Sequence, residues 1–112
     1  MHELAITESV VSTVEERVGG AQVSRVVLEM GRLSGVVPEA VRFCFDVCTA
    51  GTRLAGARLE IVETPGRGRC QDCAAEIEME NFLTLCVCGS ADLEVFAGRE
   101  LRIKEVEVIT DV

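Results

Sequence analysis

Aromatic and basic residues are scarce in this chain of 112 residues. It has no Trp or Tyr and only four Phe, so Val, Leu, Ile and Ala must form most of any core. Lys and Arg number 11 against 19 Asp and Glu, which gives a net charge of −8. Proteins that bind nucleic acid gather Lys and Arg on one surface, so this balance argues against such a partner. It fits a protein that meets other proteins or cations.

Long apolar runs and targeting signals are also missing. The apolar stretches fall far below the ~20 residues that a membrane helix needs, and the start is acidic rather than basic. We therefore expect a cytoplasmic protein without membrane contact. In a reducing cytosol, six cysteines indicate metal or redox chemistry rather than a disulfide framework.

Hydrophobic periodicity predicts two helices and three strands. A spacing of three to four residues over residues 4–18 indicates an amphipathic helix, and a proline opens a second helix over residues 38–49. Alternation of apolar and polar residues predicts strands over residues 22–30, 57–63 and 101–109. In the last strand the alternation changes phase near its middle, which indicates a bulge or bend.

The order of these elements predicts an α/β fold with an insert. Residues 65–69, Pro-Gly-Arg-Gly-Arg, have the breakers and positive charge typical of a linker. We expect a small three-stranded sheet with two helices, formed by residues 1–64 and 98–112. Residues 65–97 would form an inserted, zinc-ribbon-like domain with four cysteines.

Two closely spaced cysteine pairs lie in this insert. Cys70 and Cys73 are followed about a dozen residues later by Cys86 and Cys88, which is the spacing of a structural zinc site. Four thiolates fill the tetrahedral shell of Zn(II), so such a site stabilises a fold rather than catalysing hydrolysis. A redox dithiol and disulfides are the alternatives. One residue, Val87, separates the second pair where two are usual, which leaves the role of Cys86 open.

The remaining two cysteines, Cys44 and Cys48, lie four residues apart on the second predicted helix. They share an apolar stripe with Val37, Val41 and Phe45. Cysteines at this spacing could bind a metal, but a buried cysteine behaves as a small hydrophobe. We interpret this pair as part of the core.

The chain begins with Met1, His2 and Glu3, and His2 is its only histidine. A histidine at this position can offer a metal its imidazole, its backbone nitrogen and the nearby terminal amine, while Glu3 adds a carboxylate. Square-planar, nitrogen-rich sites of this kind suit Ni(II) or Cu(II). The alternative is a frayed terminus without a metal. Because an imidazole must be neutral to bind, acidification is expected to favour release.

Taken together, these motifs resemble the HypA/HybF family of nickel metallochaperones over essentially the whole chain. The motifs that carry the resemblance are Met1-His2-Glu3, Gly31-Arg32-Leu33-Ser34-Gly35-Val36, Pro38-Glu39-Ala40, the cysteine pairs of residues 70–88, and Gly98-Arg99-Glu100-Leu101-Arg102-Ile103. The second cysteine pair departs from the family pattern Cys-Pro-x-Cys-Gly, because it lacks the proline and one spacer residue. Cys88 still matches the second cysteine of the family pattern, whereas Cys86 lies one position away from the first.

The resemblance implies both metals and partners. Nickel would bind at His2 and Glu3, with the amine of Met1 as a further ligand, and structural zinc would bind at Cys70, Cys73, Cys86 and Cys88. The nickel would be delivered during maturation of nickel–iron hydrogenases, and to urease in some organisms. A nickel-handling GTPase (HypB) and the hydrogenase large subunit would be the partners.

Two other classes of function compete with this reading. A zinc-ribbon module could bind protein or nucleic acid without nickel transfer, although the acidic balance disfavours nucleic acid. A thiol oxidoreductase would use Cys70 and Cys73, but these cysteines lack the preceding strand and following helix of a redox fold. Catalytic triads, phosphate loops and a second histidine are absent from the sequence, so we expect no enzyme activity. We expect a monomer or a weak homodimer.

Overall fold

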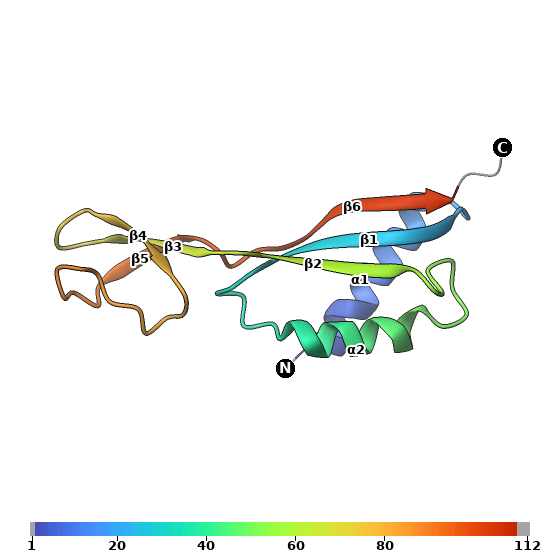
Figure 1. Ribbon diagram of the computed structural model, residues 1–112, viewed down its shortest axis with the longest axis horizontal. Coiled ribbons are helices and arrows are strands. Elements are labelled where there is room, and N and C mark those ends of the chain that lie inside the picture. Colours follow the sequence, from blue (N-terminus) through green and yellow to red (C-terminus); the bar gives the residue numbers. More distant parts are fainter. Residues whose placement is uncertain (1, 110–112) are drawn as a thin grey trace. The chain divides into compact units, whose positions relative to one another are not determined.

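A computed structural model describes residues 2–109 of the chain. Over this part of the chain the elements, in order, are α1 Glu3–Val18, β1 Gln22–Gly31, α2 Pro38–Thr49, β2 Arg58–Thr64, β3 Gly66–Cys70, β4 Glu76–Met79, β5 Leu93–Ala97 and β6 Leu101–Ile109 (Figure 1). They form two three-stranded sheets, with strand orders β2-β1-β6 and β4-β3-β5. The predicted α/β class with two helices and a three-stranded sheet is therefore confirmed.

The chain separates into two compact units. The first unit comprises the described parts of Met1–Leu28, Val36–Val62 and Arg102–Val112, and the second comprises Glu29–Gly35 and Glu63–Leu101. None of the helices within residues 2–109 has the length and apolar character needed to cross a bilayer.

The core of the first unit is mainly aliphatic, as the shortage of aromatic residues predicts. Helices α1 and α2 contact each other and lie beside the β2-β1-β6 sheet (Figure 1). The buried apolar side chains are Val10, Val11, Val14, Val23, Val26, Val27, Leu28, Val41, Phe45 and Leu54. Helix α1 ends at Val18 and is capped by Gly19, whose φ of 58° is the left-handed conformation that glycine adopts without strain.

The predicted phase change in the last strand is present in β6. Leu101, Ile103 and Val106 are half-buried, whereas Lys104 and Glu105 between them are both exposed. A regular strand would alternate without such a pair, so the side chains change face at this point.

The predicted linker at residues 65–69 is wrong, because most of it forms β3, the central strand of the second sheet. β3 pairs antiparallel with both β4 and β5. Its two glycines are buried where neighbours approach closely: a Cβ on Gly66 would clash with Leu33, and one on Gly68 would lie 2.6 Å from the Met79 sulfur. Glycine therefore serves close packing here rather than flexibility.

Candidate metal centres

The four cysteines of the second unit converge on one point. Their sulfur atoms all lie within 4.8 Å of one another. The Sγ atoms of Cys70 and Cys88 are 3.7 Å apart, and those of Cys73 and Cys86 are 3.5 Å apart. A tetrahedral site with Zn–S bonds of about 2.3 Å has sulfurs about 3.8 Å apart. The cluster therefore has nearly the size of a zinc–thiolate centre, and its sulfurs are too far apart for disulfides.

The first pair lies on a turn that follows β3, so the expectation that no strand precedes these cysteines is wrong, although the next element is β4 and not a helix. The Cys70 amide donates to the Ala75 carbonyl at 2.8 Å, and the Ala74 amide donates to the Cys70 carbonyl at 2.9 Å. Ala74 has a φ of 65°, which is the left-handed region that a side chain disfavours. The turn bends the chain sharply enough to bring Cys73 back beside Cys70.

The second pair repeats this arrangement with one residue fewer. The Cys86 amide donates to the Ser90 carbonyl at 2.9 Å, and the Gly89 amide donates to the Cys86 carbonyl at 2.8 Å. Gly89, with a φ of 91°, occupies the place that Ala74 has in the first turn. The shorter spacing is thus accommodated within the turn, and Cys86 is buried with its sulfur in the cluster.

The backbone of the first turn also stabilises a negative charge on sulfur. Hydrogen bonds from the amides of Cys73 and Asp72 lower the pKa of Cys70 to about 6. The Ser90 amide acts on Cys88 in the same direction, but the thiols of Cys86 and Cys70 outweigh it and raise the pKa of Cys88 to about 12. Four thiols at this separation cannot all ionise alone, so a divalent cation would displace their protons.

His2 lies at the start of α1. It is exposed, and its carbonyl accepts the first helical hydrogen bond, from the Ile6 amide at 2.8 Å. The His2 amide precedes the first turn of α1, where amides have no acceptor within the helix. The terminal amine of Met1, the third expected donor, lies outside the described residues.

Glu3, the other predicted nickel ligand, has a structural contact as well. Its Oε2 accepts a hydrogen bond from the Val37 amide at 3.1 Å, directly before α2 begins. The carboxylate therefore connects the start of α1 to the start of α2. Among residues 2–109, no third metal-binding side chain joins His2 and Glu3.

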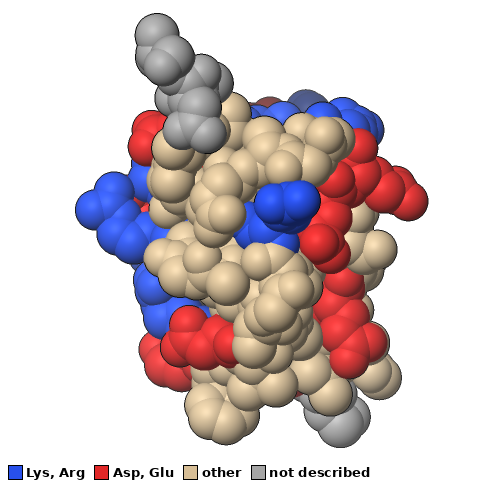
Figure 2. Space-filling view, turned by 90° about the vertical axis from the view of Figure 1, so that its right-hand side faces the viewer, with Lys and Arg blue, Asp and Glu red and all other residues tan. Residues whose placement is uncertain are grey.

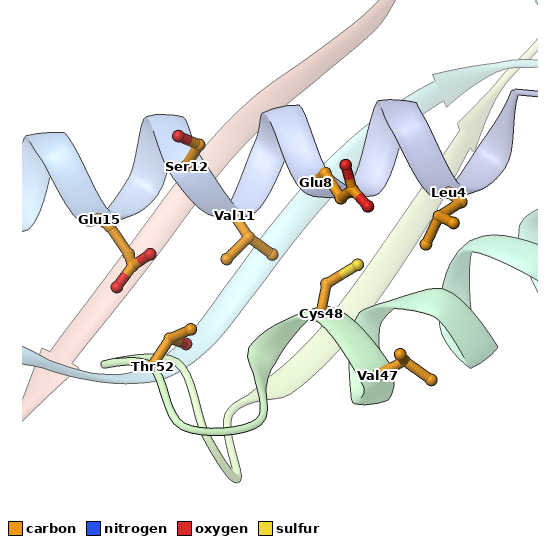
Figure 3. Close-up of a pocket in the computed structure, with 8 residues that line it drawn as sticks. All are labelled: Leu4, Glu8, Val11, Ser12, Glu15, Val47, Cys48 and Thr52. Atoms are coloured by element: carbon orange, nitrogen blue, oxygen red, sulfur yellow. The ribbon is translucent and has the colours of Figure 1, made fainter.

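Cys44 and Cys48 are not core residues, so their interpretation as such is wrong. Val41 and Phe45 are buried as predicted, but both cysteines are only half-buried. Cys48 points from α2 toward α1 and lines a groove of about 430 Å³ (Figure 3). Burial, together with the nearby Glu8 carboxylate and the Cys44 thiol, raises the pKa of Cys48. Within residues 2–109, neither cysteine belongs to a group of three or more potential metal ligands.

The distribution of charge bears on the nucleic-acid alternative. On the face shown in Figure 2, Lys and Arg side chains lie in separate groups divided by uncharged and acidic ones. A nucleic-acid interface needs a continuous basic surface, and this face does not provide one.

Comparisons with known proteins agree with one another. Residues 1–108 match a family model described as hydrogenase/urease nickel incorporation, metallochaperone, hypA. The chain is 52% identical over 108 residues to the hydrogenase maturation factor HypA of Nostoc punctiforme, with 96% of each chain covered. It is 51% identical over 109 residues to that of Geobacter sulfurreducens, with 96% of this chain and 99% of the relative covered.

A solved structure has the same fold. The solution structure of the Ni metallochaperone HypA from Helicobacter pylori matches with a TM-score of 0.66 at 22% identity, covering 99% of this chain and 100% of that one. At 22% identity this likeness shows that the two chains share a fold. Membership of the family rests on the family model and on the relatives that are about 50% identical.

Proposed function

The chain belongs to the HypA family of hydrogenase and urease nickel incorporation, whose members are metallochaperones and not enzymes. We propose that it binds Ni(II) at its amino terminus and delivers it during maturation of nickel–iron hydrogenase. The match of residues 1–108 to that family carries this proposal. The proposed nickel-binding domain comprises residues 1–64 and 98–112, and the proposed zinc-binding domain comprises residues 65–97.

In this proposal nickel is cargo, held at His2 and Glu3 with help from backbone nitrogen and the Met1 amine. The exposure of His2 supports it, because a transferable ion must be reachable by a receiving protein. The positive end of the α1 dipole opposes a bound cation, and the Glu3 carboxylate offsets this effect. Both features suit a site that captures nickel and later releases it. Since copper binds such donors more strongly than nickel, selectivity must come from metal supply and from docking.

The four cysteines would hold Zn(II) as a permanent, structural ion. Two observations support zinc: the sulfur separations of 3.5 and 3.7 Å, and the two turns whose amides approach the cluster. With four thiolates bound, no coordination position stays open for a substrate. The ion would fix the turns around the cluster and leave nickel chemistry to the amino terminus.

The proposed setting follows the family. We infer a cytoplasmic protein that receives or passes nickel in contact with a nickel-handling GTPase (HypB) and with the hydrogenase large subunit. Urease is a second recipient in some members of the family. The chain would act as a monomer or a weak homodimer.

Replacing His2 tests the nickel site directly. We expect untagged wild-type protein to bind nickel stoichiometrically in a calorimetric titration, and His2→Ala to abolish this binding because the imidazole is lost. Zinc content, measured by elemental analysis, should be the same in both. Residues added before Met1 should also weaken binding if the amine is a ligand. An unchanged nickel affinity in His2→Ala would refute the site and leave a zinc-stabilised binding module as the function.

Glu3 needs two variants, because its carboxylate also contacts α2. Glu3→Gln keeps an oxygen acceptor for the Val37 amide but removes the charge, whereas Glu3→Ala removes both. If Glu3 is a ligand, both variants lose nickel affinity. Wild-type affinity in Glu3→Gln would show that Glu3 only holds α2. Glu16→Ala, which removes an exposed carboxylate elsewhere on α1, is the matched control.

A further inference from the structure

An exposed apolar segment lies in the second unit, between β4 and Cys88. Phe82, Leu83, Leu85 and Val87 have exposed fractions of 57%, 86%, 58% and 94%. We call residues 82–87 the tip segment. Single exposed apolar residues are common on protein surfaces, but four exposed within six consecutive positions are a concentration of apolar surface that suits binding.

The first half of the tip segment is held outward by its own turn. The Asn81 side chain accepts a hydrogen bond from the Leu83 amide at 2.8 Å, and the Asn81 carbonyl accepts one from the Thr84 amide at 3.3 Å. The Arg99 guanidinium lies 5.2 Å from the centre of the Phe82 ring, a distance at which a cation and an aromatic face attract. Phe82 and Leu83 are therefore ordered while exposed.

The second half is held outward by the cluster. Leu85 and Val87 alternate with Cys86 and Cys88, whose sulfurs both lie in the cluster. Burying Val87 against its own unit would turn one or both sulfurs away from their partners. These contacts restrict the conformation of the segment, and a restricted segment loses less entropy on binding.

The charge of the second unit indicates what fits this surface. The unit carries nine Asp and Glu against four Arg, a net charge of −5. One of these four, Arg32, is paired with Glu80 at 2.7 Å. A second copy of the chain would bring two acidic units together, and an anionic membrane would likewise repel the unit. A partner with apolar side chains bordered by Lys or Arg would be attracted.

We propose that the tip segment docks a partner protein through an apolar contact bordered by basic residues on the partner. Apolar burial would supply the affinity, and the net negative charge of the second unit would orient the partner and speed its approach. Binding at this surface does not require bound nickel, so this proposal can be tested independently of the proposed nickel site.

The test uses the full-length, metal-loaded protein and a fluorescein-labelled amphipathic peptide of Leu and Lys as the probe. We expect anisotropy to show binding to wild type, and the double variant Leu83→Ser/Val87→Ser to weaken it at least about tenfold. Phe43→Ser/Val47→Ser removes two exposed apolar side chains from α2 instead and should stay within about twofold of wild type. Added salt should weaken binding to wild type. Metal content and circular dichroism check that both variants fold.

Three results would overturn the proposal. The first is wild-type affinity in Leu83→Ser/Val87→Ser. The second is equal binding of a matched peptide of Leu and Glu, which would show that the net negative charge of the second unit has no role. The third is self-association in sedimentation velocity that the same double variant abolishes, since the occupant would then be a second copy of this chain.

Discussion

At the scale of single residues, the two cysteine turns show how one arrangement tolerates two spacings. Each turn closes with an amide of the leading cysteine, and each contains one residue with a positive φ, Ala74 or Gly89. The missing residue in the second turn shortens the loop but leaves both closing hydrogen bonds in place. The position of the sulfur thus depends on the turn rather than on the number of residues between cysteines.

Ala74 provides a test of this comparison, because Gly89 takes its place in the other turn. A left-handed conformation costs a non-glycine residue about 1–2 kcal/mol, while glycine loses about 0.5–1 kcal/mol to chain entropy. We expect Ala74→Gly to raise the free energy of unfolding of the metal-loaded protein by about 0.5 kcal/mol, measured by thermal or urea denaturation. Ala75→Gly, at a neighbour without positive φ, should lower it. Equal effects of the two variants would contradict the role assigned to the turn.

At the scale of elements, glycine determines how closely chain segments approach one another in the second unit. Gly98 has a φ of 99°, and a Cβ there would clash with the Gly66 backbone at the start of β3. The Leu33 amide also donates to the Gly98 carbonyl at 2.8 Å. Both the positive φ of Gly98 and its close approach to Gly66 therefore exclude a side chain at this position.

We expect Gly98→Ala to reduce the free energy of unfolding by about 2–4 kcal/mol, because conformational strain adds to overpacking. Gly20→Ala is a matched control: Gly20 has a φ of 93°, but a Cβ there would meet nothing within 4 Å. It should cost about 1 kcal/mol, from strain alone. Urea denaturation measures both. A similar loss in the two variants would mean that the contact with Gly66 contributes little.

One arginine on the central strand of the β2-β1-β6 sheet forms ion pairs with side chains on both outer strands. Arg25 on β1 contacts Glu60 on β2 at 3.0 Å and also pairs with Glu105 and Glu107 on β6. Its side chain is 19% exposed. Removing it would leave three carboxylates, one on β2 and two on β6, without the cation that lies between them, and like charges repel.

We therefore predict that Arg25→Ala lowers the midpoint of thermal unfolding more than Arg58→Ala. Arg58 is a suitable control, because it pairs with Glu60 at the longer distance of 3.6 Å and its side chain is 76% exposed. High salt should narrow the difference by screening the carboxylates. If the two variants unfold at the same temperature, the cross-strand pairs are not coupled to folding.

At the scale of the whole molecule, the two units differ in what stabilises them. The first unit buries ten apolar side chains. The second unit buries Met30, Leu33 and Met79 together with Cys70 and Cys86 of the cluster. We therefore expect the second unit, with so few buried side chains, to depend on the proposed zinc, whereas the first has a core of its own.

Removing the proposed zinc should therefore unfold one unit selectively. We expect chelation to increase hydrogen exchange over residues 63–101 while helices α1 and α2 stay protected, as measured by mass spectrometry. The reason is that metal binding supplies folding free energy where apolar burial is small. Cys73→Ser should reproduce this pattern without a chelator, and Cys44→Ser should not. Uniform exchange across both units would show that they unfold as one.

Much of the fold and of the candidate site follows from local pattern. Periodicity located both helices and the three strands of the first sheet, because one face of each must be buried. Cysteine spacing located the cluster, since four thiols in two tight pairs are a chemical signature that needs no long-range information. The family was also recognisable from the sequence, because its motifs occur in order along the chain.

Other features were decided only when distant segments met. The sequence suggested a linker where β3 forms, because glycine marks flexibility and close packing alike, and only Leu33 and Met79 show which applies. The contact of Glu3 with Val37 and the half-burial of Cys48 depend on how α1 lies against α2. The outward direction of Leu85 and Val87 was likewise undetermined until the sulfurs beside them had partners. Composition and spacing thus determined which chemistry the chain carries, and tertiary packing determined which side chains are left to contact other molecules.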